Sequence, residues 1–110
     1  GGRVAVTYHD LRTNTSDPAT LPASVWLVTS CDGVNWAEMA VAGPLEMTMA
    51  PDANGWFLGD YQGLFATGTG QWMAVQTVTS ADTANRTDVQ AIRIRPAGAA
   101  APCTESTSAP

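Results

Sequence analysis

A carboxylate and a phenol stand side by side in the segment WFLGDYQGLF, residues 56–65. Asp60 and Tyr61 could act on a sugar, because a carboxylate can move protons and a phenol can become a nucleophile once a nearby base ionises it. The flanking glycines also suit a bulge at the start of a β-strand, where Asp60 would bind backbone amides or an arginine and Tyr61 would pack its ring. We favour this structural interpretation, ahead of sugar contact and then of a nucleophilic role.

Other reactive residue types form weaker patterns. His9 lies beside Asp10, but no serine or cysteine motif accompanies the pair, which favours a structural role for the imidazole. Trp56 is the tryptophan that we expect to be exposed and able to contact a sugar. The acidic residues lack the spacing of a calcium loop, and Cys31 and Cys103 lack the spacing of metal ligands. The sequence therefore predicts neither a metal site nor a cofactor.

Composition excludes several kinds of partner. The 110 residues suffice for one small domain, and 45% of them are hydrophobic. The net charge is −5, and the only strong cations are five arginines that form no basic stripe, so a nucleic-acid partner is not expected. No apolar run approaches the roughly 18 residues that span a bilayer, so no membrane span is expected. The two cysteines could form one disulfide in an oxidising compartment, or could stay unpaired because Cys103 falls in a weakly held tail.

Short apolar stretches separated by turn residues run through the chain, and no stretch makes a convincing helix. The pattern is that of an all-β protein with long polar loops. Residues from 96 to 110 are rich in Ala, Pro, Ser and Thr, which is typical of a disordered tail or linker. A single domain is therefore expected over 1–95. The predicted strands are 3–8, 23–30, 38–41, 57–66, 71–78 and 88–95.

Two features favour sheets that are stacked in layers. The stretches 25–28 and 71–75 are apolar on both faces, as expected of strands that are covered on both sides, for example in propeller blades. A weak internal repeat also relates residues 4–6 to 73–75 and residues 25–28 to 89–92. Because a propeller closes with about four to eight blades, a chain with about two would need the remaining blades of a longer parent protein.

A turn motif follows the second predicted strand. Ser30-Cys-Asp-Gly-Val-Asn-Trp36 has the form S-x-D-G-x-x-W and resembles the Asp box of sialidase-like (neuraminidase-repeat) β-propellers, although it lacks one residue before the glycine and has Asn35 in place of threonine. The resemblance implies that Ser30, Asp32, Gly33 and Trp36 form a structural hairpin clamp away from the substrate. Asp32 would accept hydrogen bonds from turn amides, Gly33 would take a positive φ, and Trp36 would plug the space between neighbouring strands.

Two further segments carry the same resemblance. The segment VTYHDLR at 6–12 is similar to strand ends of the form aromatic-x-D-x-R in those propellers, and FLGDYQGL at 57–64 is similar to their G-D-Y-x-G-L segment. The three segments extend the resemblance over residues 3–95. It implies about two antiparallel blades of a sialidase-like β-propeller, as the C-terminal part of a larger one.

The resemblance also suggests roles for particular residues. Exo-sialidases of this superfamily use a tyrosine nucleophile activated by a glutamate, an aspartate acid/base, and three arginines that bind the substrate carboxylate. Tyr61 matches the tyrosine at the start of a strand, but the glutamate's place falls near Gln76, which cannot take a proton. Arg12 is the arginine at a blade-end position. With Asp60 and Trp56 it forms the set of predicted substrate-binding residues.

The expected function is that of a glycan-related protein. The resemblance implies the C-terminal part of a bacterial, secreted or cell-surface glycoside hydrolase of exo-sialidase type, or of a glycan-binding propeller, inactive as a fragment. Its partners would be glycans and the remaining blades of the parent chain. Two alternatives stay open: a structural or adhesive propeller module without a hydrolytic site, and an independent β-sandwich that binds carbohydrate.

Overall fold

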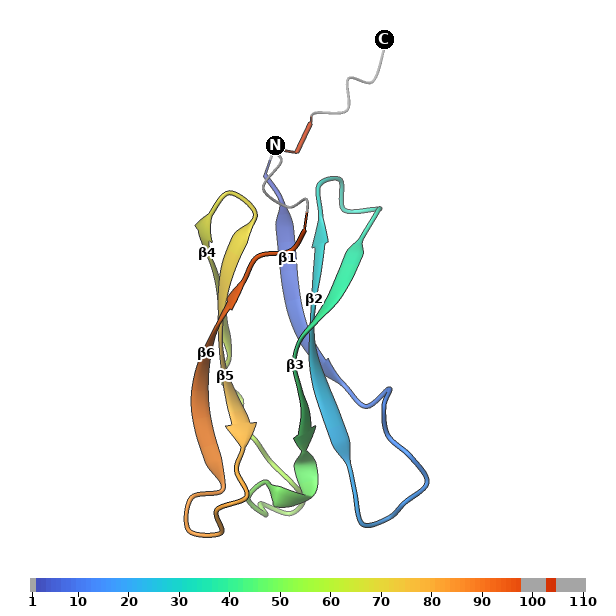
Figure 1. Ribbon diagram of the computed structural model, residues 1–110, viewed down its shortest axis with the longest axis vertical. Coiled ribbons are helices and arrows are strands. Elements are labelled where there is room, and N and C mark those ends of the chain that lie inside the picture. The colour runs from blue at the N-terminus through green and yellow to red at the C-terminus, as the bar shows by residue number, and fades with distance from the viewer. Residues whose placement is uncertain (1, 98–102, 105–110) are drawn as a thin grey trace.

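The computed structural model describes residues 2–97, 103 and 104, and the regular secondary structure of this part is almost entirely β-strand (Figure 1). Six strands form two three-stranded antiparallel sheets, in the orders β1-β2-β3 and β4-β5-β6. This confirms the prediction of an all-β fold, whereas the identity of the sheets as propeller blades stays a prediction. Most of the predicted tail lies outside the described residues. The elements are β1 (Val4–Asp10), β2 (Pro22–Ser30), β3 (Ala37–Glu46), the 3-10 turn η1 (Met47–Met49), β4 (Gly63–Gly68), β5 (Gln71–Thr79) and β6 (Thr87–Ile94).

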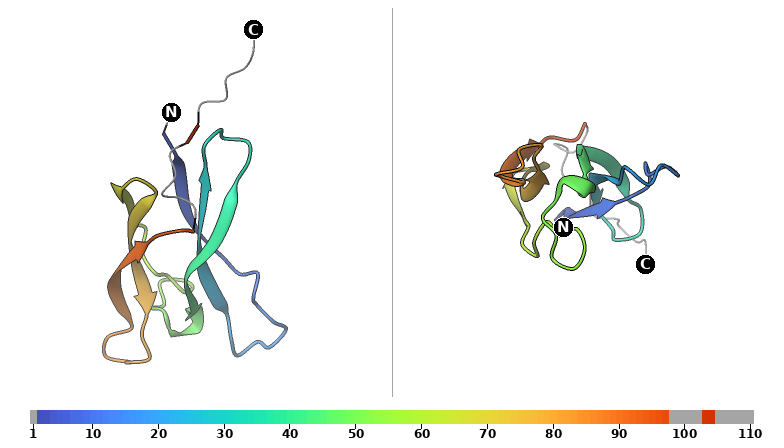
Figure 2. Two further views of the ribbon diagram at one scale, coloured as in Figure 1. Left: turned by 45° about the horizontal axis from the view of Figure 1, so that its top comes forward. Right: turned by 90° about the horizontal axis from the view of Figure 1, so that it is seen from below.

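The two sheets pack against each other through their inner faces (Figure 2). Side chains alternate between the two faces of a strand, so every second residue of the central strands β2 and β5 points to the other sheet. Leu27 of β2 packs with Trp72 and Ala74 of β5, while Val25 of β2 packs with Val78 of β5. Burying an aliphatic or aromatic side chain of this size contributes about 1.5–3 kcal/mol, so these contacts hold the sheets together.

The outer faces of both sheets carry apolar side chains that remain exposed. Val4 and Val6 of β1 lie on the face opposite to Leu27 and are 52% and 45% exposed. Phe65 of β4 and Val89 of β6 lie on the outer face of the second sheet and are 53% and 73% exposed. The central strands are thus buried on one face and only partly covered on the other, which agrees in part with the apolar pattern of residues 25–28 and 71–75.

Several predicted boundaries are wrong. β3 continues to Glu46, through the Gly43-Pro44 pair and beyond the predicted end at residue 41. The strand tolerates this pair because β3 lies at a sheet edge and Gly43, with φ +110°, forms part of an irregularity in the pairing with β2. β4 begins only at Gly63, so residues 57–62, which were predicted to belong to this strand, lie outside it.

The proposed internal repeat does not follow the topology. It relates residues 4–6 of β1 to residues 73–75 of β5, and residues 25–28 of β2 to residues 89–92 of β6. β1 is an edge strand and β5 is central, whereas β2 is central and β6 is an edge strand. The apolar stretches therefore resemble one another because each belongs to a strand, without occupying equivalent positions in the two sheets.

A disulfide joins the turn after β2 to the chain beyond β6. Cys31 and Cys103 are bonded, with 5.5 Å between their Cα atoms and a sequence separation of 72 residues. The sequence had left their pairing open. The bond encloses all strands from β3 to β6, so it ties the end of the second sheet to the first sheet.

Gly43→Ala should lower the free energy of unfolding by about 2 kcal/mol or more. A Cβ at Gly43 would lie 3.0 Å from Ala23 O and 3.0 Å from Ser24 Cα, and φ is already +110°. Urea unfolding followed by tryptophan fluorescence measures the change. Gly63→Ala is the matched control, since its Cβ would meet only Val75 Cβ at 3.9 Å. Equal stability of the two variants would contradict this account of Gly43.

Removing the disulfide by Cys31→Ser with Cys103→Ser should cost about 2–4 kcal/mol of stability, because the unfolded chain regains the freedom of a long loop. The bond closes a separation of 72 residues. Urea unfolding of the oxidised parent and of the double variant gives the difference. A variant with the midpoint of the parent would show that the bond does not constrain the unfolded chain.

Candidate functional site

An open pocket of about 320 Å³ lies between the two sheets. Its walls come from the end of β1, the start of β2, η1, the segment 58–62 and the second half of β5. These parts meet at the lower end of the molecule in Figure 1, opposite the β2–β3 turn. The apolar part of the pocket wall is formed by Leu21, Ala23 and Leu58. Polar groups are added by His9 and Gln76. The size and this mixture are typical of small-molecule sites.

Gln76 is the most unusual residue of this pocket. It lies on the inner face of β5, in the alternating series that also includes Trp72, Ala74 and Val78, and it is 3% exposed. Its Nε2 is buried without a hydrogen-bond partner. Leaving such a donor unpaired costs about 1–3 kcal/mol, so the position is not explained by stability alone. From the sequence, Gln76 was expected only to be an unsuitable base, although a polar residue in series with Trp72, Ala74 and Val78 was a visible signal.

Tyr61 and Asp60 also line the pocket, at the segment that leads into β4. Gly59 has φ +107°, a conformation that favours glycine, and the chain turns there just before the two residues. Tyr61 is 93% exposed, so the expectation that its ring would pack against the strand entry is wrong. The structure places Tyr61 and Gln76 around one pocket.

His9 lines the same pocket from β1, in register with Val25 of β2. Partial burial against the pocket wall lowers the pKa of the imidazole from its ordinary value, because the charged form loses hydration. The imidazole is therefore predominantly neutral at pH 7 and can both donate and accept a hydrogen bond.

A glutamate organises another wall of the pocket. Glu46 Oε1 accepts hydrogen bonds from the backbone N–H of Leu21 at 2.6 Å and from Thr48 N–H at 3.2 Å and Thr48 Oγ1 at 2.9 Å. The bond from Leu21 is the main reason why the pKa of Glu46 is lowered. Because Leu21 and Met47 both line the pocket, this carboxylate fixes two of its walls.

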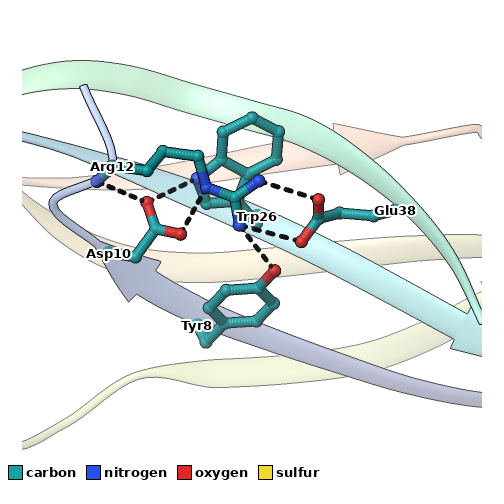
Figure 3. A network of polar contacts seen from close by, with 5 residues as sticks. All are labelled: Tyr8, Asp10, Arg12, Trp26 and Glu38. Atoms are coloured by element: carbon teal, nitrogen blue, oxygen red, sulfur yellow. Dashed lines mark hydrogen bonds and ion pairs between the residues drawn. The ribbon is translucent and has the colours of Figure 1, made fainter.

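Arg12 forms a polar network on the outer face of the first sheet (Figure 3). Its guanidinium binds Glu38 through two hydrogen bonds of 2.8 and 3.0 Å, donates to Tyr8 Oη at 3.0 Å and pairs with Asp10. The same group lies over the Trp26 ring, 3.7 Å from its centroid. Arg12 does not line the pocket, and its guanidinium is engaged by these partners, so its role as a substrate ligand stays a prediction without geometric support.

Asp10 connects this network to the pocket. Its Oδ1 accepts a hydrogen bond from Trp26 Nε1 at 3.0 Å, and the residue also lines the pocket. Desolvation by itself would raise the pKa of Asp10, but the hydrogen bonds and the charge of Arg12 outweigh it and lower the pKa. Asp10 is therefore a carboxylate at neutral pH. The segment at 6–12 that carried the resemblance thus brings Tyr8, Asp10 and Arg12 together as a structural unit.

The turn between β2 and β3 is held by side chains at the other end of the molecule. Asp32 Oδ1 accepts hydrogen bonds from the backbone N–H groups of Val34 and Asn35 at 2.8 and 2.7 Å, and Oδ2 accepts one from Asn35 Nδ2 at 2.7 Å. Ser30 Oγ donates to Asp32 Oδ1 and accepts from Gly33 N–H at 2.8 Å. Gly33 has the expected positive φ, +75°. These contacts make the turn a structural clamp.

Trp36 and Trp56 are both exposed, and neither lines the pocket. Trp36 is 46% exposed, so within the described residues it is not a buried plug between strands. Trp56 is 49% exposed, as expected, but it pairs with Asp52 in an isolated bridge and does not line the pocket. A sugar-binding role for Trp56 stays a prediction.

Within the described part of the chain, no three His, Cys, Asp or Glu residues gather closely enough to hold a metal ion. No helix of that part is long and apolar enough to cross a membrane. Comparisons with protein-family models, curated proteins and solved structures give no match. The pocket geometry is therefore the main basis for a functional proposal.

Acid should destabilise the fold partly through Asp32. Hydrogen bonds, first from Asn35 N–H and then from its side chain, hold the pKa of Asp32 well below its usual value of 3.8. A carboxylate with a lowered folded-state pKa contributes stability above the unfolded-state pKa and loses it as the pH falls below that value. We expect the melting temperature to decline below about pH 4, and Asp32→Asn to weaken this decline.

Melting curves between pH 2 and 7 measure this effect. Asp52→Asn is the control, because Asp52 accepts one backbone hydrogen bond, from Gly55 N–H. An acid transition that is identical in Asp32→Asn and in the parent would contradict the role of Asp32.

Proposed function

We propose that this chain is the C-terminal part of a sialidase-like β-propeller and that the pocket between its two sheets binds a glycan without cleaving it. The observation that carries this proposal is a pocket of about 320 Å³ whose lining includes both an exposed tyrosine and a buried amide with an unpaired Nε2. An aromatic ring can stack on the apolar face of a pyranose, and an amide can bind its hydroxyl groups. The tyrosine ring is thus complementary to the apolar face of a sugar, and the amide is complementary to its hydroxyl groups.

The arrangement favours binding over hydrolysis. A tyrosine nucleophile needs a base within hydrogen-bond distance to remove its proton. The residues that β5 brings to the pocket are Gln76 and Thr77, which take no proton at neutral pH, and within the described residues no base is hydrogen-bonded to the Tyr61 hydroxyl. The ring of Tyr61 is 93% exposed, which suits a stacking surface and leaves a phenolate without the buried, charge-stabilising surroundings of a catalytic group.

The location that we propose is outside the cytoplasm, either secreted or on a bacterial cell surface. The Cys31–Cys103 disulfide supports this, because such bonds form and persist in oxidising environments. The exposed apolar side chains on both outer faces, such as Val6 and Val89, support further blades as neighbours. A structural or adhesive module would use the same outer faces, and it would differ in showing no glycan binding at the pocket.

Tyr61→Ala should weaken glycan binding about tenfold, because a stacking surface worth about 1.4 kcal/mol is removed. Isothermal titration against a panel of neutral and sialylated oligosaccharides measures the affinity. Phe65→Ala is a matched control, since it also removes an exposed aromatic ring but on the outer face of β4. Tyr61→Phe keeps the ring and should keep most of the affinity.

Absence of any binding across the panel would overturn the proposed function and favour the adhesive or structural module. Hydrolysis of a fluorogenic sialoside by the parent chain, lost in Tyr61→Phe, would contradict the non-catalytic assignment. Binding that is equally reduced by Phe65→Ala would place the ligand somewhere other than the pocket.

A further inference from the structure

We infer that the sugar bound by this pocket is uncharged, so that acidic sugars, sialic and uronic acids included, are poor ligands. This inference rests on the proposed glycan binding and deepens it, since it names the class of sugar. It follows from the charges around the pocket and from the unpaired amide of Gln76.

The charged groups that line the pocket are carboxylates. Asp10 stands at the end of β1, and Asp60 stands in the segment before β4. Asp10 is paired with Arg12, so a carboxylate on the ligand would chiefly face the Asp60 carboxylate, and this like charge disfavours binding. The chain as a whole has a net charge of −5, which adds to this repulsion at longer range.

Among the described lining residues, no arginine or lysine faces the Asp60 carboxylate. None of those residues is an arginine, and the sequence contains no lysine. Arg12 is the cation nearest in sequence to the pocket residue Asp10, but its guanidinium is already bound by Glu38, Tyr8 and Asp10. His9 is predominantly neutral at pH 7, because partial burial lowers its pKa. A ligand carboxylate would therefore lack the arginine forks that usually bind such groups.

The polar groups that remain suit hydroxyl groups. Gln76 Nε2 is buried and unpaired, and rotation about the soft terminal torsion of glutamine can turn this donor toward the cavity. The carboxylate of Asp60 accepts hydrogen bonds, and hydroxyl groups can both donate and accept them. Leu21, Ala23 and Leu58 offer apolar surface to the C–H groups of the ring. A neutral pyranose fits all of these groups.

The direct test compares ligands that differ in one group. Methyl glucoside and methyl glucuronide share every ring substituent except that a carboxylate replaces the primary alcohol, and methyl galactoside and methyl galacturonide form a second such pair. We expect the neutral member of at least one pair to bind, with its acidic partner weaker by about tenfold or more. Chemical-shift titration of the whole chain at pH 7 and low salt measures both affinities. The methyl glycoside of N-acetylneuraminic acid and that of N-acetylglucosamine complete the series.

The outcomes separate the two proposals. Binding of the neutral sugars alone supports both of them. Equal or tighter binding of the acidic sugars overturns this inference but leaves the glycan-binding function standing. Absence of binding by any member of the series defeats the inference together with the function on which it rests.

A substitution tests whether Gln76 is the anchor. Gln76→Met has nearly the same shape but no amide, so it removes a buried donor that the free protein leaves unpaired. We expect unchanged or raised thermal stability together with about tenfold weaker binding of the neutral sugar. Gln90→Met is the control, because Gln90 pairs with Gln76 in register on β6, is exposed and does not line the pocket. If Gln76→Met lowered the thermal stability but kept the full affinity for the neutral sugar, Gln76 would have a structural role and would not be the anchor of the sugar.

Discussion

The contact between the inner faces of β2 and β5 is the interaction on which the rest of the molecule depends. A three-stranded antiparallel sheet whose apolar faces are exposed is not stable alone, and it becomes stable when one of those faces is covered by another element. Leu27 and Val25 of the first sheet meet Trp72 and Val78 of the second, and neither cluster could form within one sheet. The pocket lies between the same two sheets, so its shape follows from this packing.

Two structural devices occupy the opposite ends of the sheets. At one end, Asp32 holds the β2–β3 turn, and the Cys31–Cys103 bond ties the chain after β6 to that turn. At the other end, Glu46 fixes the backbone at Leu21, and residues 58–62 lead over to the second sheet. The end that holds the β2–β3 turn therefore has a structural role, because its hydrogen bonds and its disulfide fix the chain there. The pocket end keeps an exposed tyrosine and an unpaired amide, which stability does not require.

Sequence patterns predicted the strands well where local rules dominate. The strand predicted at 71–78 and the turn chemistry of Asp32 and Gly33 depend on a few neighbouring residues, and the structure confirms both. Features set by distant contacts were missed. Gly43 lies within β3 because an irregular pairing with β2 accommodates it, and Glu38 reaches Arg12 only across the sheet. The Tyr61 ring was expected to pack, but no local rule tells whether a neighbouring segment will cover it.

The central claim is that the end of the sheets opposite the disulfide is a binding site for sugar. Assigning the backbone amide resonances and titrating the chain with a neutral oligosaccharide tests it most directly, because the shifts map the contact residue by residue. The account predicts perturbations at 9–11, 58–62 and 76–77, with little change in the turn at 31–36. Perturbations confined to that turn or to the outer faces would contradict it.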